Sequence, residues 1–439
     1  MNYIQSILFL LLACIGIGLF IRNILKIRRN ILLGKEENRS DNSSERWKLM
    51  FRIAVGQGKM MVKPVAGFFH ILVYVGFIII NIELIEIFID GIFGTHRYIG
   101  HLLPAPVYNF ITATLDVLAL LVIIAVTVFF FRRNITKVPR LNSKDLLGWP
   151  KMDGNLILII EFCMMTALLS MNSADTILQN RAGLATVGYF PVSDSIFGGL
   201  FSGFSVESLH FIEKSAWWFH FIGILFFMNY LYFSKHLHIL FAFPNTYYSN
   251  LNKKGELNNI ESITKEVKLM MDPNADPYAA APEGTVPEKF GASDVTDLSW
   301  VQLLNAYTCT ECGRCTSNCP ANITGKKLSP RKIMMSVRDR IEEVGKNIDK
   351  NGSFVDDGKQ LLGDYITAEE LWGCTSCNAC VEACPVLINP LSIIIDMRRY
   401  LVMEQSAAPQ ELNMMMANIE NNSAPWQFSQ SDRANWTQD

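Results

Sequence analysis

Five long apolar stretches separated by polar loops dominate the first 241 residues of the chain. They cover about residues 3–22, 65–89, 107–131, 155–172 and 216–241. A helix needs roughly 20 consecutive apolar residues to cross the hydrocarbon core of a bilayer. The pattern therefore predicts a transmembrane domain over residues 1–241, a bundle of five helices surrounded by membrane lipid.

Basic residues divide the loops of this bundle into two groups. Eleven Lys and Arg residues lie in segment 22–63 and six in segment 132–154, whereas segments 90–106 and 173–215 carry one and two. Loops rich in Lys and Arg stay on the cytoplasmic side. We therefore expect the N-terminus outside and everything after residue 241 in the cytoplasm. The first stretch has no basic residue before it and no small-residue cleavage site after it, which favours an uncleaved anchor over a signal peptide.

The pattern changes after residue 241. Residues 242–289 are polar and rich in proline, as expected of a cytoplasmic linker, with one helical piece near 258–271. Residues 290–404 show helical periodicity, most clearly over 331–343 and 391–402, and a capping-box pattern at 367–370. Residues 405–439 form a polar tail without a core-forming pattern. The predicted fold class is all-α, with the five-helix bundle followed by a compact cytoplasmic helical domain.

Composition supports a membrane protein and limits its partners. Half of the 439 residues are hydrophobic and 18% are charged, against about 25% charged in a typical soluble domain. This balance excludes a disordered chain, a coiled coil and an ordinary soluble enzyme. The net charge of −2 gives no indication of nucleic acid as a partner.

Eight of the ten cysteines lie in two runs of the same pattern. One run is Cys309, Cys312, Cys315 and Cys319, and the other is Cys374, Cys377, Cys380 and Cys384, each followed by proline. In C-x2-C-x2-C-x3-C-P runs the first three thiolates hold one [4Fe–4S] cluster, and the fourth holds the other cluster. The spacing therefore predicts a first cluster site (Cys309, Cys312, Cys315 and Cys384) and a second cluster site (Cys374, Cys377, Cys380 and Cys319).

A pair of zinc sites is the alternative interpretation of these cysteines. Zinc knuckles combine C-x2-C pairs that are separated by a dozen or more residues. They need neither a third cysteine at the same short gap nor the closing Cys-Pro. Thiols gathered in two short runs, rather than spread as in a disulfide scaffold, also indicate a reducing compartment. The pattern therefore favours two [4Fe–4S] clusters.

Three histidines fall within the predicted spans, where an ionisable side chain is costly and indicates function. His70 and His238 are expected at the same depth near the cytoplasmic side on two different helices, so they could clamp one haem iron. His220 is expected near the outer end of the last span. If that span is one continuous helix, the step from His220 to His238 is five turns, about 27 Å, and His236 points away from the pair.

Acidic residues also lie in or near the spans, on the outer side by the predicted topology. They include Glu83, Glu86 and Asp116. These carboxylates could take protons from a quinol, or they could end the helices at the lipid headgroups. The sequence leaves both alternatives open.

Two segments carry a resemblance to known families. The text "CTECGRCTSNCP…GKKLSPRKIMMSVRDRI", followed by "ELWGCTSCNACVEACPVLINPLSIIIDMRRYLV", resembles the two-cluster α-helical ferredoxin domain of heterodisulfide reductase C subunits and related iron–sulfur oxidoreductases. The resemblance implies that residues 290–404 form such a domain, with a helical connection between the two cysteine runs.

The segments "GFFHILVYVGFIII" and "WWFHFIGILFFMNYLYFSKHLHIL" resemble two spans of the gamma subunit of respiratory nitrate reductase. That cytochrome b type holds two haems on four histidines. His70, His220 and His238 match three of them, and the fourth falls at Ile80, which cannot ligate iron. The resemblance implies one haem b on His70 and His238, and leaves a second haem on His220 without its partner.

The segment "NIENNSAPWQFSQSDRANW" resembles the one that precedes a cysteine-rich CCG-type catalytic domain in fused members of the ferredoxin family. No CCG repeat is present in the sequence. The resemblance therefore implies that the catalytic module is a separate cytoplasmic subunit of the heterodisulfide reductase B/D type, and that residues 405–439 dock it.

Together these patterns predict a multi-pass protein of the bacterial inner (cytoplasmic) membrane that transfers electrons. Electrons would pass between the quinone pool and haem b, then through two [4Fe–4S] clusters to the soluble partner, and no residue of this chain is assigned a catalytic role. One alternative is a membrane-anchored iron–sulfur redox sensor, against which stands the lack of a recognisable output module. The other alternative is an anchor subunit that binds no haem.

Overall fold

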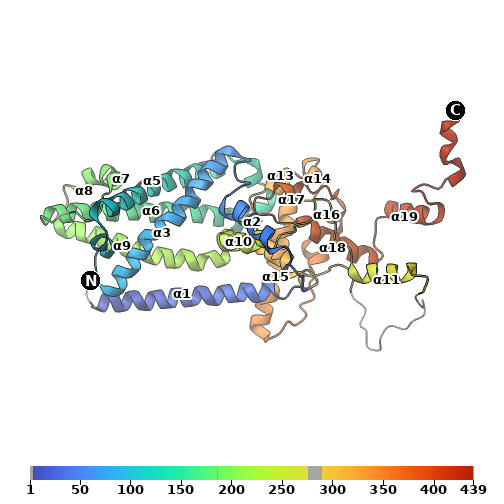
Figure 1. Cartoon of the computed structure of the whole chain (residues 1–439), viewed down its shortest axis with the longest axis horizontal. Helices are drawn as coiled ribbons and strands as arrows, with labels where there is room; N and C mark the ends of the chain where they lie inside the picture. The colour runs from blue at the N-terminus through green and yellow to red at the C-terminus, as the bar shows by residue number, and fades with distance from the viewer. Residues whose placement is uncertain (1–2, 185, 275–288, 439) are drawn as a thin grey trace.

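The computed structural model describes residues 3–184, 186–274 and 289–438 (Figure 1). Within these ranges the chain forms helices and two isolated β-bridges but no strand, which confirms the predicted all-α fold class. The predicted linker over 242–289 lies in part outside the described residues, because 275–288 are not among them.

The α-helices are α1 (Tyr3–Ile31), α2 (Ser43–Met50), α3 (Pro64–Phe93), α4 (Tyr98–Leu102), α5 (Ala105–Asn134), α6 (Trp149–Arg181), α7 (Pro191–Ser193), α8 (Gly199–Phe201), α9 (Val206–Tyr230), α10 (His238–Tyr247), α11 (Glu261–Met271), α12 (Trp300–Thr308), α13 (Arg314–Ser317), α14 (Pro320–Ile323), α15 (Pro330–Asn351), α16 (Ala368–Trp372), α17 (Ala379–Ala383), α18 (Pro390–Met403) and α19 (Gln410–Asn422). Short 3₁₀ or π turns are η1 (Phe51–Val55), η2 (Pro139–Leu141), η3 (Lys144–Leu146), η4 (Asp194–Gly198), η5 (Leu231–Phe233), η6 (Lys235–Leu237), η7 (Val295–Asp297), η8 (Leu361–Tyr365) and η9 (Gln430–Thr437).

The helices α1, α3, α5, α6 and α9 form an elongated bundle (Figure 1), and each contains a window apolar enough to cross a membrane. The number of predicted spans is therefore confirmed. Helix α6 packs on α5 and α9, α3 packs on α5, and α1 lies against α3 and α9. The helices extend beyond the apolar stretches that predicted them, because polar residues at their ends continue the helical hydrogen bonding.

Close packing inside the bundle depends on small and aromatic residues. Gly76 of α3 lies against Val122 of α5, where a Cβ would come within 2.5 Å of the valine side chain. Phe9 of α1 stacks on Phe221 of α9 with ring centroids 4.0 Å apart. Many outward side chains of α1, such as Leu11, are apolar and exposed. A surface of this kind suits contact with lipid, where small residues bring helices together.

The fifth predicted span, residues 216–241, is not one helix. Helix α9 begins at Val206 and ends at Tyr230, the chain then makes two 3₁₀ turns, and α10 starts at His238. The prediction that His220 and His238 lie on one continuous helix, five turns apart, is therefore wrong.

The break between α9 and α10 has a local cause. Ser234 is extended, with ψ 150°, and its hydroxyl accepts a hydrogen bond of 3.1 Å from the N–H of His236. The carboxylate of Asp153 on α6 accepts from the N–H of Lys235 at 3.1 Å. These side chains satisfy the backbone donors that a continuous helix would have paired, so hydropathy alone does not reveal the break.

Residues 289–404 form a compact group of helices at one end of the bundle (Figure 1). The predicted helices over 331–343 and 391–402 are confirmed as parts of α15 and α18. Thr367 caps α16 in the predicted capping box with Glu370. Two ion pairs tie this core together, because the buried Arg340 guanidinium bonds both Asp294 and Asp357.

The bundle end that meets these helices is called the cluster-facing end, and the opposite end the far end. The last turns of α1 contact α12 and α15 at the cluster-facing end. Helix α10 also contacts α12 there, so it belongs to the junction rather than to the bundle. Helix α19 and the residues after it extend away from the body of the molecule (Figure 1).

Candidate cluster and haem sites

The two cysteine runs fold into loops of the same shape. In the first loop Glu311 and Gly313 have positive φ values of 54° and 72°, and in the second loop Ser376 and Asn378 have 55° and 60°. These left-handed residues occupy the same places relative to the cysteines of each run. Such turns curl a short loop so that its thiols point to a common interior.

The first cluster site comes together as predicted from spacing. Cys309, Cys312, Cys315 and Cys384 line one hollow between the first loop and the chain after α17. Backbone N–H groups point at sulfur here, since the N–H of Ile388 lies 3.3 Å from the Cys384 sulfur. Hydrogen bonds of this kind favour the thiolate form that binds metal.

The second cluster site shows the same grouping. The charges of Cys319 and Cys377 act on Cys374, and those of Cys374, Cys319 and Cys377 act on Cys380. The fourth cysteine of the first run therefore lies beside the first three of the second run. Among the described residues no three His, Cys, Asp or Glu side chains are arranged as the ligands of a single metal ion. The thiols of the first site surround a hollow instead.

Burial controls the protonation of these thiols. Desolvation raises the pKa of Cys309 and of Cys380 to about 12, and that of Cys384 to about 11, with neighbouring thiols adding to the effect. Without a metal the thiols are therefore protonated near neutral pH. Because the thiolate is the ligand, filling the sites must release protons, and the iron of a [4Fe–4S] core supplies the compensating positive charge.

His70 and His238 face each other at the cluster-facing end. Their ring centroids are 6.4 Å apart. Two metal–imidazole bonds of about 2 Å each, on opposite sides of one ion, together with the half-width of each ring, span a separation of this size. The Nδ1 of His238 lies 3.3 Å from the Lys235 carbonyl oxygen, which leaves its Nε2 available. Among the described residues the buried Nδ1 of His70 has no hydrogen-bond partner. The pair therefore fits the axial ligands of a haem.

Two other histidines differ from the sequence expectation or lack a partner. His236 was expected to point away, but its ring centroid lies 5.7 Å from that of His238, because the segment is a 3₁₀ turn rather than an α-helix. His220 is buried on α9, with Nδ1 3.3 Å from the Met164 carbonyl oxygen. Ile80 is packed in the apolar core of the bundle.

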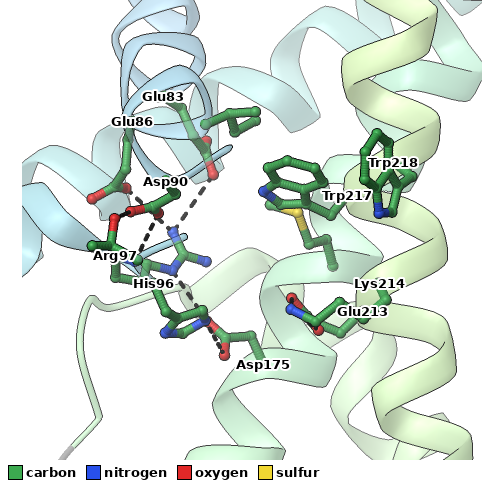
Figure 2. Close-up of a pocket in the computed structure, with 13 residues that line it drawn as sticks. Glu83, Glu86, Asp90, His96, Arg97, Asp175, Glu213, Lys214, Trp217 and Trp218 are labelled. Atoms are coloured by element: carbon green, nitrogen blue, oxygen red, sulfur yellow. Dashed lines mark hydrogen bonds and ion pairs between the residues drawn. The ribbon is translucent and has the colours of Figure 1, made fainter. Parts of the chain in front are cut away.

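A polar pocket occupies the far end of the bundle (Figure 2). Its centre is the buried Arg97, which bonds Asp175 at 3.1 Å and Asn172 at 2.6 Å and lies 3.7 Å from Glu83. Figure 2 shows Trp217 across the pocket from this ion network. Sequence analysis missed Arg97 because its partners come from three separate segments.

The far-end carboxylates divide into two kinds. Glu86 accepts hydrogen bonds from the Tyr108 hydroxyl and the Ile99 N–H. Asp116 accepts from the backbone of Val192 and from Ser193, so both are structural. By contrast, neither oxygen of the buried Glu83 accepts a hydrogen bond in the described part of the chain.

Comparison with known proteins identifies the domain that holds the cysteines. Residues 308–388 match the family of 4Fe-4S dicluster domains, a range that contains both runs. This part of the chain is therefore an iron–sulfur domain, as predicted. No solved structure matches the chain.

Several curated proteins are similar to more of the chain. It is 28% identical, over 98% of its length, to the probable iron-sulfur-binding oxidoreductase FadF of Bacillus subtilis. It is also 28% identical, over 92% of its length, to the EtfAB:quinone oxidoreductase of Syntrophomonas wolfei. A probable membrane-anchored ferredoxin of Chromohalobacter salexigens is 34% identical over 34% of the chain and 24% of that protein.

The chain spans 60% and 56% of the length of the first two relatives. These relatives and the domain match agree with an iron–sulfur electron-transfer role in a membrane protein. The predicted haem, quinone and partner subunit are finer statements than the comparisons make.

Proposed function

We propose that the chain transfers electrons between the quinone pool and a soluble redox partner, through haem b and two [4Fe–4S] clusters. One observation carries the proposal: the His70–His238 pair and the first cluster site meet at the same end of the bundle. An apolar bundle thereby ends directly on an iron–sulfur domain. The relative named EtfAB:quinone oxidoreductase supports the quinone assignment.

The chain's own residues bind and orient the redox groups. His70 and His238 hold the haem from two helices, and the carbonyl oxygen of Lys235 fixes the ring of His238. The eight clustered thiolates hold the two iron–sulfur cores. Once bound, these groups supply one-electron redox chemistry, and the protein supplies their spacing. The domain limits 1–241, 242–289, 290–404 and 405–439 remain part of this proposal.

The proposed location is the bacterial inner membrane, with the N-terminus outside and the iron–sulfur domain in the cytoplasm. The distribution of Lys and Arg supports this orientation. The far-end pocket then faces the outer side, and the His70–His238 pair the inner side.

The far-end pocket is the candidate quinol site. It offers Glu83 as a buried carboxylate that lacks a donor, and Trp217 as an aromatic wall. A quinol hydroxyl could donate to Glu83, and the His96–Asp175 pair at the rim could pass the proton outward. His70 lies 13 residues from Glu83 on α3, roughly 20 Å along the helix. Electrons leaving this pocket would therefore need a second haem, on His220, as an intermediate.

We expect a short-chain quinol to reduce the haem of the purified protein, and a Glu83→Gln variant to slow that step by about 100-fold, because a positioned base is lost. Stopped-flow absorbance of the haem measures the rate. Glu207→Gln, an exposed change at the start of α9, is the matched control and should have no effect. An unchanged rate in Glu83→Gln, or a content of one haem per chain, would move the quinol site away from this pocket.

The soluble partner is proposed to be a CCG-type cytoplasmic protein related to heterodisulfide reductase B/D. Similarity to the dihydromethanophenazine:CoB--CoM heterodisulfide reductase of Methanosarcina mazei, to one of whose components 34% of the chain is matched with 27% identity, supports this class of partner. The docking segment would be residues 405–439. Trp426, Phe428 and Trp436 are 44%, 68% and 77% exposed there, and exposed tryptophan is typical of binding hot spots.

Deletion of residues 421–439 should abolish co-purification of that partner while the haem and cluster spectra stay unchanged. The deleted segment makes no ion pair to the rest of the described chain, so its loss should not unfold the iron–sulfur domain. Affinity purification followed by mass spectrometry checks the result. Ser429→Ala, within the same segment, is the control, and retention of the partner by the truncated chain would exclude docking by this tail.

A further inference from the structure

We propose that the first cluster site is the one that exchanges electrons with the His70–His238 site, and that a buried ion pair between Lys235 and Glu311 holds these two sites together. The second cluster site then faces the soluble partner. This inference rests on the proposed function and adds the order of the groups and the residues that fix it.

The first cluster site is attached to the loops at the cluster-facing end of the bundle. The Arg140 guanidinium, from the loop after α5, donates to the Cys312 carbonyl oxygen at 2.5 Å. The Lys59 ammonium, from the loop before α3, donates to the Cys384 carbonyl oxygen at 3.3 Å. Arg314, beside Cys315, donates in return to the Lys59 carbonyl oxygen at 2.9 Å. Three of the four ligand segments therefore contact the bundle.

Lys235 connects the histidine segment to the same cluster loop. Its carbonyl oxygen lies 3.3 Å from Nδ1 of His238, and its ammonium donates to Glu311 at 2.8 Å. Glu311 stands between Cys309 and Cys312 in the first loop. Both side chains are buried, with 7% and 2% of their surface exposed. One residue thus orients a haem ligand through its backbone and contacts the cluster loop through its side chain.

Glu311 is held on two sides. Arg338 of α15 bonds its other carboxylate oxygen, and its backbone has a positive φ of 54°. A non-glycine residue in this conformation is maintained only where the surroundings over-determine it. The ion pairs of Glu311 therefore fix the loop that carries Cys309 and Cys312 relative to the bundle.

The second cluster site has a different environment. Arg398 of α18 bonds the Cys374 carbonyl oxygen and stacks over Trp372 at 4.9 Å, so its contacts stay within the iron–sulfur domain. Cys377 is exposed. Among the described residues no hydrogen bond or ion pair joins residues 374–380 to the bundle. This side is accessible to a soluble partner.

Each transfer moves one electron. Oxidation of ferrous to ferric iron at the His70–His238 site is balanced by reduction of a [4Fe–4S] core from 2+ to 1+ at the first cluster site. The same electron then passes to the second site and restores the first. No bond forms or breaks, so distance and relative position control the rate, and Lys235 and Glu311 act as positioning residues.

Redox titration of the Glu311→Gln variant tests the ion pair. Removing one buried negative charge leaves Lys235 and Arg338 uncompensated, so the reduction potentials of the haem and the first cluster should both rise, while that of the second cluster stays unchanged. Glu369→Gln, an exposed change on the second-cluster side, should shift none of them. Lys235→Arg, which keeps the ion pair, should retain the wild-type potentials.

Cluster variants test the order of transfer. In Cys377→Ala the haem should still reduce the remaining cluster at the wild-type rate, as followed by rapid-freeze EPR. In Cys312→Ala the remaining cluster should be reduced at least about tenfold more slowly, since its neighbour in the chain of carriers is lost. Equal rates in the two variants would overturn the proposed order.

Two further results keep the outcomes distinct. If the cysteine variants lose both clusters, the titration of Glu311→Gln decides, and a shift confined to the second cluster would overturn the proposal. If the wild-type protein contains no haem, the proposed function fails. Haem and cluster spectra that are intact in wild type but unaffected by Glu311→Gln would instead refute only the role of the ion pair.

Discussion

The His70→Leu variant should lose the reduced-minus-oxidised b-type spectrum of the wild-type protein, and His238→Leu should lose the same spectrum. The two rings lie 6.4 Å apart on separate helices, so each supplies one of the two axial ligands and neither suffices alone. Pyridine haemochrome analysis should show that each variant loses the same haem.

Two histidines serve as controls for this experiment. His101→Leu changes an exposed residue of α4 at the far end and should leave the haem intact. His236→Leu should also retain it, although the His236 ring lies 5.7 Å from that of His238. Loss of haem in His236→Leu with retention in His70→Leu would assign the second ligand to His236. A wild-type protein without b-type bands would favour the haem-free anchor.

The Cys384→Ala variant should lose the iron of the first cluster site, although Cys384 belongs to the second cysteine run. Two [4Fe–4S] clusters give about eight iron and eight acid-labile sulfide per chain besides haem iron, and this variant should retain about four of each. Its remaining EPR signal should match that of Cys312→Ala and differ from that of Cys377→Ala. The reason is that Cys384 lines one hollow with Cys309, Cys312 and Cys315.

A milder change provides a second measurement of the same ligand. Cys384→Ser keeps an oxygen ligand, so both clusters should assemble and only the EPR signal of the first should shift. Cys319→Ser should shift the other signal. A signal of the second cluster that changes in Cys384→Ser would mean that each run holds its own cluster. Stoichiometric zinc without labile sulfide in the wild-type protein would support zinc sites.

Local pattern was sufficient for the helices and the cysteine loops. Hydropathy located the five spans, because the solvent around a transmembrane helix is uniform along its length. The capping box at Thr367 and the helix over 331–343 were also predicted, since both depend on residues within a few positions of each other. The spacing of the cysteines contains the geometry of each loop for the same reason.

The junction between the bundle and the iron–sulfur domain could not be predicted in this way. The break at Ser234 depends on Asp153, which lies 81 residues earlier in the chain. The pairing of Lys235 with Glu311 and that of Arg97 with Glu83 and Asp175 also join residues from separate segments. Hydrophobic periodicity contains no information on which distant polar groups meet.

The amino-acid sequence by itself determined the fold class, the five spans, the two cysteine runs and the histidines able to bind iron. These depend on apolar length, local spacing and residue chemistry. Only the tertiary structure decided that α9 ends before His238, that His236 turns towards His238 and that Glu83 is left without a donor. It also decided that the first cluster site, rather than the second, lies against the bundle. Each of these depends on buried polar groups finding partners, because an unpaired buried group is costly, and those partners come from elsewhere in the chain.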